Sequence, residues 1–164
     1  MKQEFKLTFT DLIESDIDVV CYIDSLCHPN PLEPKHLQWC FDAKQTCIKG
    51  VLDEELVCYC ILLFEFGDVR VANITVKPEY QYKGIGTQLM DYIFELSKNN
   101  VVRGRQPKSV WLEVRSTNVN AIEFYKKLGF TQENVVKDHY TYTLDGDEIT
   151  EDALILSKPA RVKS

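Results

Sequence analysis

The stretch VKPEYQYKGIGT, residues 76–87, decides the fold of this chain. An alternating apolar segment ends at Pro78 and a helical pattern begins at Gly84, so the stretch joins a strand to a helix. A junction of this kind presents unpaired backbone N–H groups and the positive end of a helix dipole. Gly84 and Gly86 let the oxygens of an anion approach the backbone without a Cβ in the way. The stretch predicts an anion cradle, although the two glycines alone fit a simple tight turn equally well.

Apolar periodicity predicts regular elements on both sides of this junction. In the strand at residues 108–115, Val110, Leu112 and Val114 face one side and leave Glu113 on the other. The order of elements predicts an α/β fold in which helices cover a mixed sheet. Helices are predicted for residues 11–26, 33–41, 84–98 and 118–128. Strands are predicted for residues 5–9, 46–52, 56–65, 69–77, 108–115, 132–140 and 153–157, with an acidic loop between the last two.

Length and composition bound the class of protein. The 164 residues predict one domain over residues 1–164, ending in a flexible tail at residues 159–164. A hydrophobic content of 45% excludes an intrinsically disordered chain. The net charge of −6 argues against a nucleic-acid partner. This charge is unevenly spread, because residues 1–60 carry 11 acidic and 5 basic side chains whereas residues 61–137 carry 8 and 11.

The sequence shows no targeting or membrane segment. The charged start MKQEFK lacks the apolar core of a signal peptide, and the longest apolar run, residues 56–64, is far shorter than the ~20 residues that cross a bilayer. We therefore expect a cytoplasmic protein whose cysteines are reduced. All six cysteines lie in residues 1–60, where buried free thiols are the favoured interpretation. No metal site is predicted, because no standard zinc spacing is matched by the four possible ligands Cys27, His28, His36 and Cys40.

Two blocks of sequence carry a resemblance to a known family. Gln81-x-x-Gly84-x-Gly86 resembles the acyl-CoA signature (Arg/Gln)-x-x-Gly-x-(Gly/Ala) of the GCN5-related N-acetyltransferase (GNAT) superfamily. WLEVRSTNVNAIEFYKKLGF, residues 111–130, resembles the second motif of that superfamily. A P-loop does not fit, because the lysine precedes the first glycine, and a Rossmann fingerprint lacks its third small residue at Leu89. Within the superfamily the chain is most similar to the RimI-type and other protein N-terminal acetyltransferases.

The resemblance implies the GNAT fold, a central and mostly antiparallel sheet with splayed central strands and about four helices. It also implies acetyl-CoA as co-substrate and direct transfer of the acetyl group, in a ternary complex, to the N-terminal α-amine of a protein or peptide. Acetylation of a small amine or a lysine side chain, and a non-catalytic acyl-CoA-binding regulator, stay open as alternatives. For Asn118 a plain helix N-cap fits equally well. The implied cofactor-binding residues are Ile74, Val76, Gln81, Tyr82, Lys83, Gly84, Ile85, Gly86, Thr87 and Asn118.

Two residues of the second block are candidates for acid–base chemistry. Glu113 can point away from the packed face of its strand, and the resemblance implies that it is the base. A carboxylate that pairs with Arg115 or a neighbour is the alternative. An α-amine has a pKa near 8, so a modest base acting through a water suffices at pH 7. Tyr125 is the implied acid for the leaving thiolate, with simple packing on its helix as the alternative.

The resemblance implies that two further pairs of residues bind the acceptor peptide. Pro29 and Pro31 lie between the first two predicted helices, in the loop that shapes the peptide pocket of N-terminal acetyltransferases. His139 and Tyr140 stand where related enzymes carry a Tyr-Tyr pair that grips the peptide backbone, and a surface histidine is the alternative for the first. The expected partners are protein or peptide N-termini, together with an auxiliary subunit or the ribosome, and neither nucleic acid nor membrane.

Overall fold

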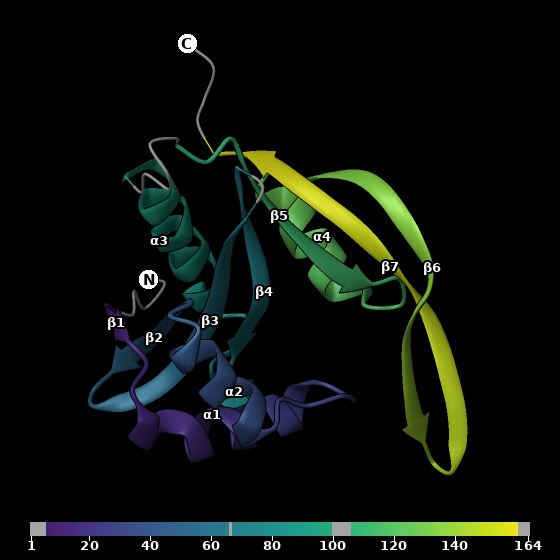
Figure 1. Ribbon diagram of the computed structural model, residues 1–164, viewed down its shortest axis with the longest axis horizontal. Coiled ribbons are helices and arrows are strands. Elements are labelled where there is room, and N and C mark those ends of the chain that lie inside the picture. Colours follow the sequence, from purple (N-terminus) through teal and green to yellow (C-terminus); the bar gives the residue numbers. More distant parts are fainter. Residues whose placement is uncertain (1–5, 66, 100–105, 161–164) are drawn as a thin grey trace. The chain divides into compact units, whose positions relative to one another are not determined.

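The computed structural model describes residues 6–65, 67–99 and 106–160, and the chain divides into two compact units (Figure 1). Unit 1 consists of Met1–Leu63 and Ala72–Leu96, and unit 2 consists of Phe64–Val71 and Ser97–Ser164. Long strands pass through both units, and the order of hydrogen-bonded neighbours is β1-β2-β3-β4-β5-β7-β6. Within the described ranges no helix is long and apolar enough to span a membrane.

The elements follow one another in an alternating order. The helices are α1 (Ile17–Cys27), α2 (Pro34–Asp42), α3 (Ile85–Asn99) and α4 (Val119–Lys127), with short 3₁₀ turns η1 (Glu14–Asp16) and η2 (Pro78–Tyr80). The strands are β1 (Thr8–Asp11), β2 (Thr46–Leu52), β3 (Glu55–Glu65), β4 (Asp68–Val76), β5 (Ser109–Arg115), β6 (Thr131–Leu144) and β7 (Asp147–Pro159). The predicted α/β class with helix-covered strands is confirmed.

In unit 1, helices pack against both faces of an antiparallel β1-β2-β3 sheet. One face carries an apolar core formed by α1, α2, β2 and β3, in which Val20, Ile23, Leu37 and Tyr59 are fully buried. On the other face Phe9 of β1 stacks on Tyr92 of α3, with ring centroids 4.5 Å apart. Helix α3 was predicted from the apolar stripe of Ile85, Leu89, Ile93 and Leu96, of which the first three are buried and Leu96 is half-buried.

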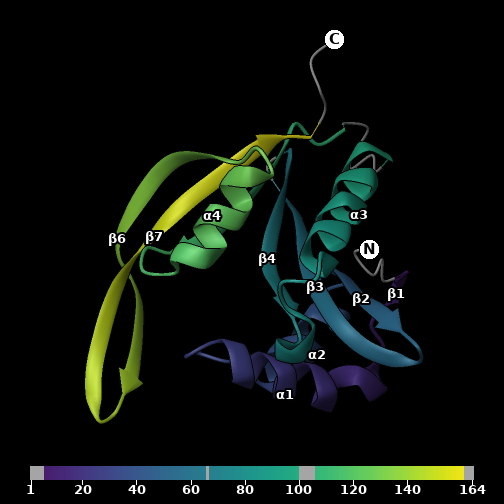
Figure 2. The ribbon, with the colours of Figure 1, turned by 180° about the vertical axis from the view of Figure 1, so that it is seen from behind.

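In unit 2, β5 lies between one parallel and one antiparallel neighbour. Val69–Val71 of β4 pair in parallel with Val110–Leu112, and β5 then pairs with β7 in antiparallel register. The β6–β7 hairpin continues as a two-stranded ribbon beyond β5, and α4 lies against β5 and β7 (Figure 2). Val110, Leu112 and Val114 are buried, as the alternation in β5 predicts. The mixed, mostly antiparallel pairing agrees with the expected fold.

Two element predictions are wrong in their extent. Residues 11–26 were expected to form one helix, but Asp11 closes β1 and α1 begins only at Ile17. β1 pairs with Ile48–Val51 of β2, and this pairing overrides the local helical pattern. The acidic loop expected between residues 140 and 153 is instead a tight turn at Asp145 and Gly146, which both have positive φ. The strand expected at residues 5–9 includes Phe5, which lies outside the described residues.

The cysteines behave as the sequence interpretation proposed. All six are free; Cys40, Cys47, Cys58 and Cys60 are buried, and Cys21 and Cys27 are half-buried. Burial raises the pKa of the Cys47 and Cys58 thiols to about 12. These thiols therefore stay protonated at neutral pH and pack as small apolar groups. Ala160, in the segment expected to be a tail, donates its N–H to the Lys108 carbonyl at 2.9 Å, and residues 161–164 lie outside the described part of the chain.

Candidate active site

The strand-to-helix junction in unit 1 has an open backbone at Gly84. This residue has a φ of +83°, and a Cβ placed there would meet no atom within 4 Å. It caps α3, since its carbonyl accepts the N–H of Gln88 at 3.2 Å. The N–H groups of the first turn of a helix have no acceptor within that helix, so residues 85–87 can donate to an anion. This open backbone is compatible with the anion cradle that the sequence predicts, and the cradle stays a prediction.

Gln81 fastens the start of the junction to the end of β4. Its Nε2 donates to the carbonyl of Val76 at 3.0 Å and faces Cys27 Sγ at 3.8 Å. The next residue, Tyr82, has a φ of +62° and is almost fully exposed. The Lys83 ammonium lies 5.8 Å from the centroid of a tyrosine ring in η2. Gln81 thus has a structural role within unit 1 in addition to any contact with a cofactor.

A buried carboxylate anchors the loop between α1 and α2. Asp24, 1% exposed, accepts hydrogen bonds from Tyr59 Oη at 2.5 Å, from Asn73 Nδ2 at 3.1 Å and from the Leu32 N–H at 2.6 Å. At the start of the loop, His28 Nε2 lies 3.0 Å from Thr75 Oγ1 on β4. Both ends of residues 28–32 are therefore tied down, with the predicted acceptor residues Pro29 and Pro31 exposed between them.

Glu113 lies in the middle of β5 in unit 2 and is held by two partners. Its side chain is 16% exposed; Oε1 is 3.3 Å from Arg70 Nη2, and Oε2 is 2.6 Å from His139 Nε2. Arg115, the partner considered in the sequence, instead lies 3.4 Å from Glu151 Oε2 on β7. The structure brings together the predicted base and the predicted substrate residue His139, and it adds Arg70.

Tyr125 and Asn118 occupy one helix of unit 2. Tyr125 is buried, and its ring packs edge-on against Phe130 with centroids 5.6 Å apart. Burial raises the pKa of the Tyr125 phenol well above its ordinary range, so the hydroxyl keeps its proton. Asn118 Oδ1 accepts the N–H of Ala121 at 3.3 Å, which confirms the N-cap interpretation of this residue.

Tyr140 stands next to His139, and their rings meet edge-to-face at 4.8 Å. Burial and the nearby Glu113 carboxylate raise the pKa of Tyr140 to about 12, although Arg70 and Arg115 act in the opposite direction. Its hydroxyl is therefore protonated and a hydrogen-bond donor at neutral pH.

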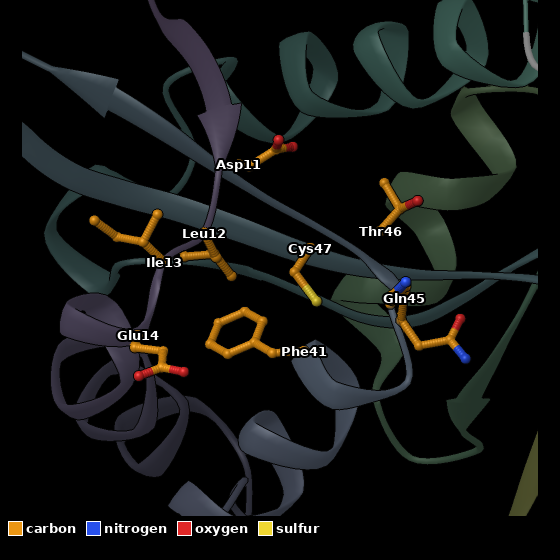
Figure 3. Close-up of a pocket in the computed structure, with 9 residues that line it drawn as sticks. Asp11, Leu12, Ile13, Glu14, Phe41, Gln45, Thr46 and Cys47 are labelled. Carbon is orange, nitrogen blue, oxygen red and sulfur yellow. The ribbon is translucent and has the colours of Figure 1, made fainter.

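A pocket of about 580 Å³ in unit 1 contains none of these residues (Figure 3). It lies between residues 11–14 and residues 41–47, with Leu12, Phe41 and Cys47 pointing inward. Asp11, Glu14 and Lys44 also line it. Because the predicted site residues all lie elsewhere, this pocket is not part of the candidate site.

The fold and these residues define the class of an acyl-CoA N-acyltransferase: a glycine-bearing junction at the start of α3, a held carboxylate on β5 and a buried phenol on α4. The chain belongs to the acetyltransferase (GNAT) family, whose model matches residues 15–130. As a member it is an acetyl-CoA-dependent N-acetyltransferase. This confirms the family resemblance of residues 81–86 and 111–130.

Individual relatives agree over nearly the whole chain. The chain is 28% identical to the [ribosomal protein bS18]-alanine N-acetyltransferase of Escherichia coli over 153 residues, 93% of this chain and 97% of that protein. The crystal structure of the ribosomal-protein-S18-alanine N-acetyltransferase from Escherichia coli matches with a TM-score of 0.81 and 26% identity over 97% of both chains. An N-alpha-acetyltransferase of Saccharolobus solfataricus is 36% identical over 90 residues, 55% of this chain and 47% of that protein.

Sequence reasoning missed Arg70 and Asp24. In the parallel register of β4 and β5, Arg70 pairs with Trp111, which lies two residues before Glu113 on the same face of β5. A short-range sequence pattern contains no information on the register between two strands. Asp24 did leave a signal. It follows Ile23 on the buried face of α1, where an unpaired acid would be costly, so its position predicts buried donors around it.

Proposed function

We propose that this enzyme acetylates the N-terminal α-amine of proteins or peptides, by direct attack of the amine on acetyl-CoA. The observation that carries the proposal is the carboxylate of Glu113, one-sixth exposed and fixed between Arg70 and His139. The likeness to an alanine N-acetyltransferase of a ribosomal protein and to an N-alpha-acetyltransferase supports the choice of acceptor. In this proposal the ribosome or an auxiliary subunit presents the substrate, and the protein works in the cytoplasm.

Unit 1 supplies the residues that we propose for the co-substrate. The N–H groups of Ile85, Gly86 and Thr87 donate to the pyrophosphate, and the exposed Gly84 leaves the approach open. Lys83 and Tyr82 flank the same turn and Gln81 holds it to β4. The backbone of Ile74 and Val76 pairs with the pantetheine arm as a further strand would, and in unit 2 the amide of Asn118 contributes a hydrogen bond.

Glu113 drives the removal of a proton from the amine, acting through an intermediate proton carrier. An α-ammonium has an ordinary pKa near 8, so about a tenth of it is neutral at pH 7. A lysine ammonium, with a pKa near 10.4, would need a base stronger by over two pK units. A carboxylate is a modest base by its ordinary pKa, and this favours the α-amine as acceptor.

Tyr125 protonates the leaving thiolate in this proposal. The C–N bond forms as the neutral amine attacks the thioester carbonyl, the C–S bond breaks, and the sulfur takes the phenolic proton. The proton that the nitrogen loses on becoming an amide returns the Tyr125 phenolate to a phenol. Burial keeps that proton on Tyr125 until the thiolate appears. In unit 2 the proposal assigns Tyr140 as a donor to a carbonyl of the peptide. In unit 1 it assigns the loop of Pro29 and Pro31, which is anchored at Leu32 and His28, to contacts with the first side chains of the peptide.

The acceptor class is tested by release of free CoA thiol from acetyl-CoA. A panel contains peptides with free N-termini, the same peptides blocked at the α-amine but carrying a lysine, and polyamines. We expect turnover only where the α-amine is free. Turnover confined to lysine peptides would remove the N-terminal assignment. Tight binding of CoA with no turnover on any amine would leave a non-catalytic binding protein.

The two proton-transfer roles are tested by Glu113→Gln and Tyr125→Phe. Each should lower kcat by about 10²–10⁴-fold and change the affinity for CoA by less than threefold. Glu123→Gln and Tyr22→Phe, at exposed positions on α4 and α1, are matched controls that should leave kcat unchanged. Equal losses in kcat and in CoA affinity would mean that Glu113 and Tyr125 serve only the structure.

A further inference from the structure

His139 reaches Glu113 because of an irregularity in the β6–β7 hairpin. The regular register places Ile155 of β7 opposite Glu113, and Asn134 of β6 opposite Ile155. His139 is five residues beyond Asn134 on β6, so in a regular strand pairing it would lie far along the strand from Glu113. Its imidazole nevertheless lies 2.6 Å from the Glu113 carboxylate. A local distortion of β6 must therefore redirect the side chain.

That distortion is a bulge held by one carboxylate. Val136 pairs with Ala153 and Tyr140 pairs with Glu151, so residues 137–139 of β6 oppose the single residue Asp152 of β7. The Asp152 carboxylate accepts the N–H of Asp138 at 3.0 Å, and its other oxygen lies 3.1 Å from the ammonium of Lys137. Asp138 has a φ of +51°, a conformation that aspartate tolerates. Bulges commonly re-aim a side chain in this way.

The two nitrogens of His139 face different surroundings. Nε2 faces Glu113, and in the neutral ring an N–H on this atom satisfies the carboxylate. Nδ1 has no hydrogen-bond partner among residues 6–65, 67–99 and 106–160, and the side chain is 34% exposed. Its lone pair is therefore available to a proton donor from outside the chain. A base whose second nitrogen is oriented by a carboxylate is the arrangement of the catalytic triads.

We propose that His139 is the proton acceptor of the transfer reaction, with Glu113 orienting its ring and stabilising the imidazolium. This inference rests on the proposed function and names the proton carrier through which Glu113 acts. The ammonium of the acceptor gives one proton to Nδ1, and the neutral amine then attacks the thioester. The amide, the free thiol and one proton released to solvent complete the balance.

Basicity favours the imidazole over the carboxylate for this task. An imidazole has an ordinary pKa near 6.5 and a carboxyl group one near 4.3, so the proton is held roughly a hundredfold better by the former. The other carboxylate oxygen of Glu113 lies 3.3 Å from Arg70 Nη2, so both oxygens are engaged by cationic or N–H groups. Several other titratable or charged groups surround the pair from four strands. They are Arg70 on β4, Arg115 on β5, Lys137, Asp138 and Tyr140 on β6, and Glu151 and Asp152 on β7.

The test compares His139→Gln with wild type from pH 6 to pH 9.5, on a peptide with a free N-terminus. Glutamine can still donate a hydrogen bond to Glu113 but cannot take a proton. We expect kcat to fall about 10²-fold or more at pH 7 and less than tenfold at pH 9.5, where the α-amine is already neutral. CoA affinity should change less than threefold. His36→Gln, at an exposed histidine of α2, is the matched control.

Chemical rescue distinguishes proton transfer from support of the structure. Added imidazole should restore part of the rate of His139→Ala at pH 7, and should leave the rates of wild type and of the control Glu123→Gln unchanged. Asp152→Ala, which releases the bulge, should lose kcat as His139→Gln does. If His139→Gln keeps the wild-type rate, or loses the same factor at every pH without rescue, His139 is not the base. Absence of turnover by wild type on any amine would instead defeat the proposed function.

Discussion

Replacing Asp24 by alanine should destabilise unit 1 by about 2–6 kcal/mol. The change removes the acceptor of the buried Tyr59 hydroxyl and of two half-buried donors, the Leu32 N–H and the Asn73 amide. A buried donor left without an acceptor costs about 1–3 kcal/mol, and the two half-buried donors, which water reaches in part, together add about as much. Tyr59 is fully buried, so its hydroxyl has no access to bulk water as a substitute.

Equilibrium unfolding in urea measures this cost, as the free energy of unfolding extrapolated to water. Asp24→Asn keeps an accepting oxygen and should lose less than Asp24→Ala. Tyr59→Phe should cost only about 1 kcal/mol, because Asp24 keeps its other donors. In the Asp24→Ala background, Tyr59→Phe should add little, since the bond between these two groups is already lost. Asp18→Ala, an exposed acid on the same helix, should cost under about 1 kcal/mol. A loss below about 1 kcal/mol for Asp24→Ala would refute the anchoring role of this carboxylate.

Three further outcomes follow from the packing and the charges. Burial alone would raise the pKa of Glu151, but hydrogen bonds from Thr117 and Tyr142 and the Arg115 charge lower it. The ionised Glu151 therefore stabilises the fold fully above about pH 5, and this stabilisation is lost as the pH falls through the lowered pKa. Glu151→Gln should flatten the dependence of thermal stability on pH between pH 5 and pH 3, and an unchanged slope would contradict this. Gly50→Ala would drive a Cβ into Cys58 Sγ and lower the free energy of unfolding by about 1–3 kcal/mol. Most of this loss should be recovered when Cys58→Ala is added. An undiminished loss in the double variant would exclude the clash as its cause. In the native protein a thiol reagent should label about two cysteines, with the rest reacting only on unfolding; rapid native labelling of more would contradict the burial of Cys40, Cys47, Cys58 and Cys60.

Sequence patterns predicted the helices and strands whose apolar residues repeat with the period of the element. The stripe of Ile85, Leu89 and Ile93 predicted α3, and the alternation around Leu112 predicted β5 and the side on which Glu113 lies. In both cases the pattern repeats over several turns or pairs, so one exception would not hide it. The same reasoning found the N-cap at Asn118.

The parts of the fold and site that the sequence did not predict depend on strand register, which local sequence patterns do not contain. β6 was expected to end at Tyr140, because an acidic stretch follows it, yet the hairpin continues to a turn at Asp145 and Gly146. β6 is exposed along almost its whole length, so it shows little of the apolar alternation that marks a half-buried strand. The bulge that brings His139 to Glu113 is likewise a matter of how β6 aligns with β7.

Some of the excess acidic side chains of the protein make contacts within the fold. An excess of carboxylates in residues 1–60 could attract a cationic acceptor, but several of them are committed to contacts within unit 1. Asp24 is buried and bonded to the Leu32 backbone, and Asp16 lies 2.7 Å from Lys49. In unit 2, Asp152 holds the backbone of Asp138 in the same manner. In each unit a carboxylate thus binds the backbone N–H of an irregular segment and fixes the segment that carries the proposed acceptor residues. Placement of those segments is therefore one physical role of the negative charge, and it acts at contact distance rather than at long range.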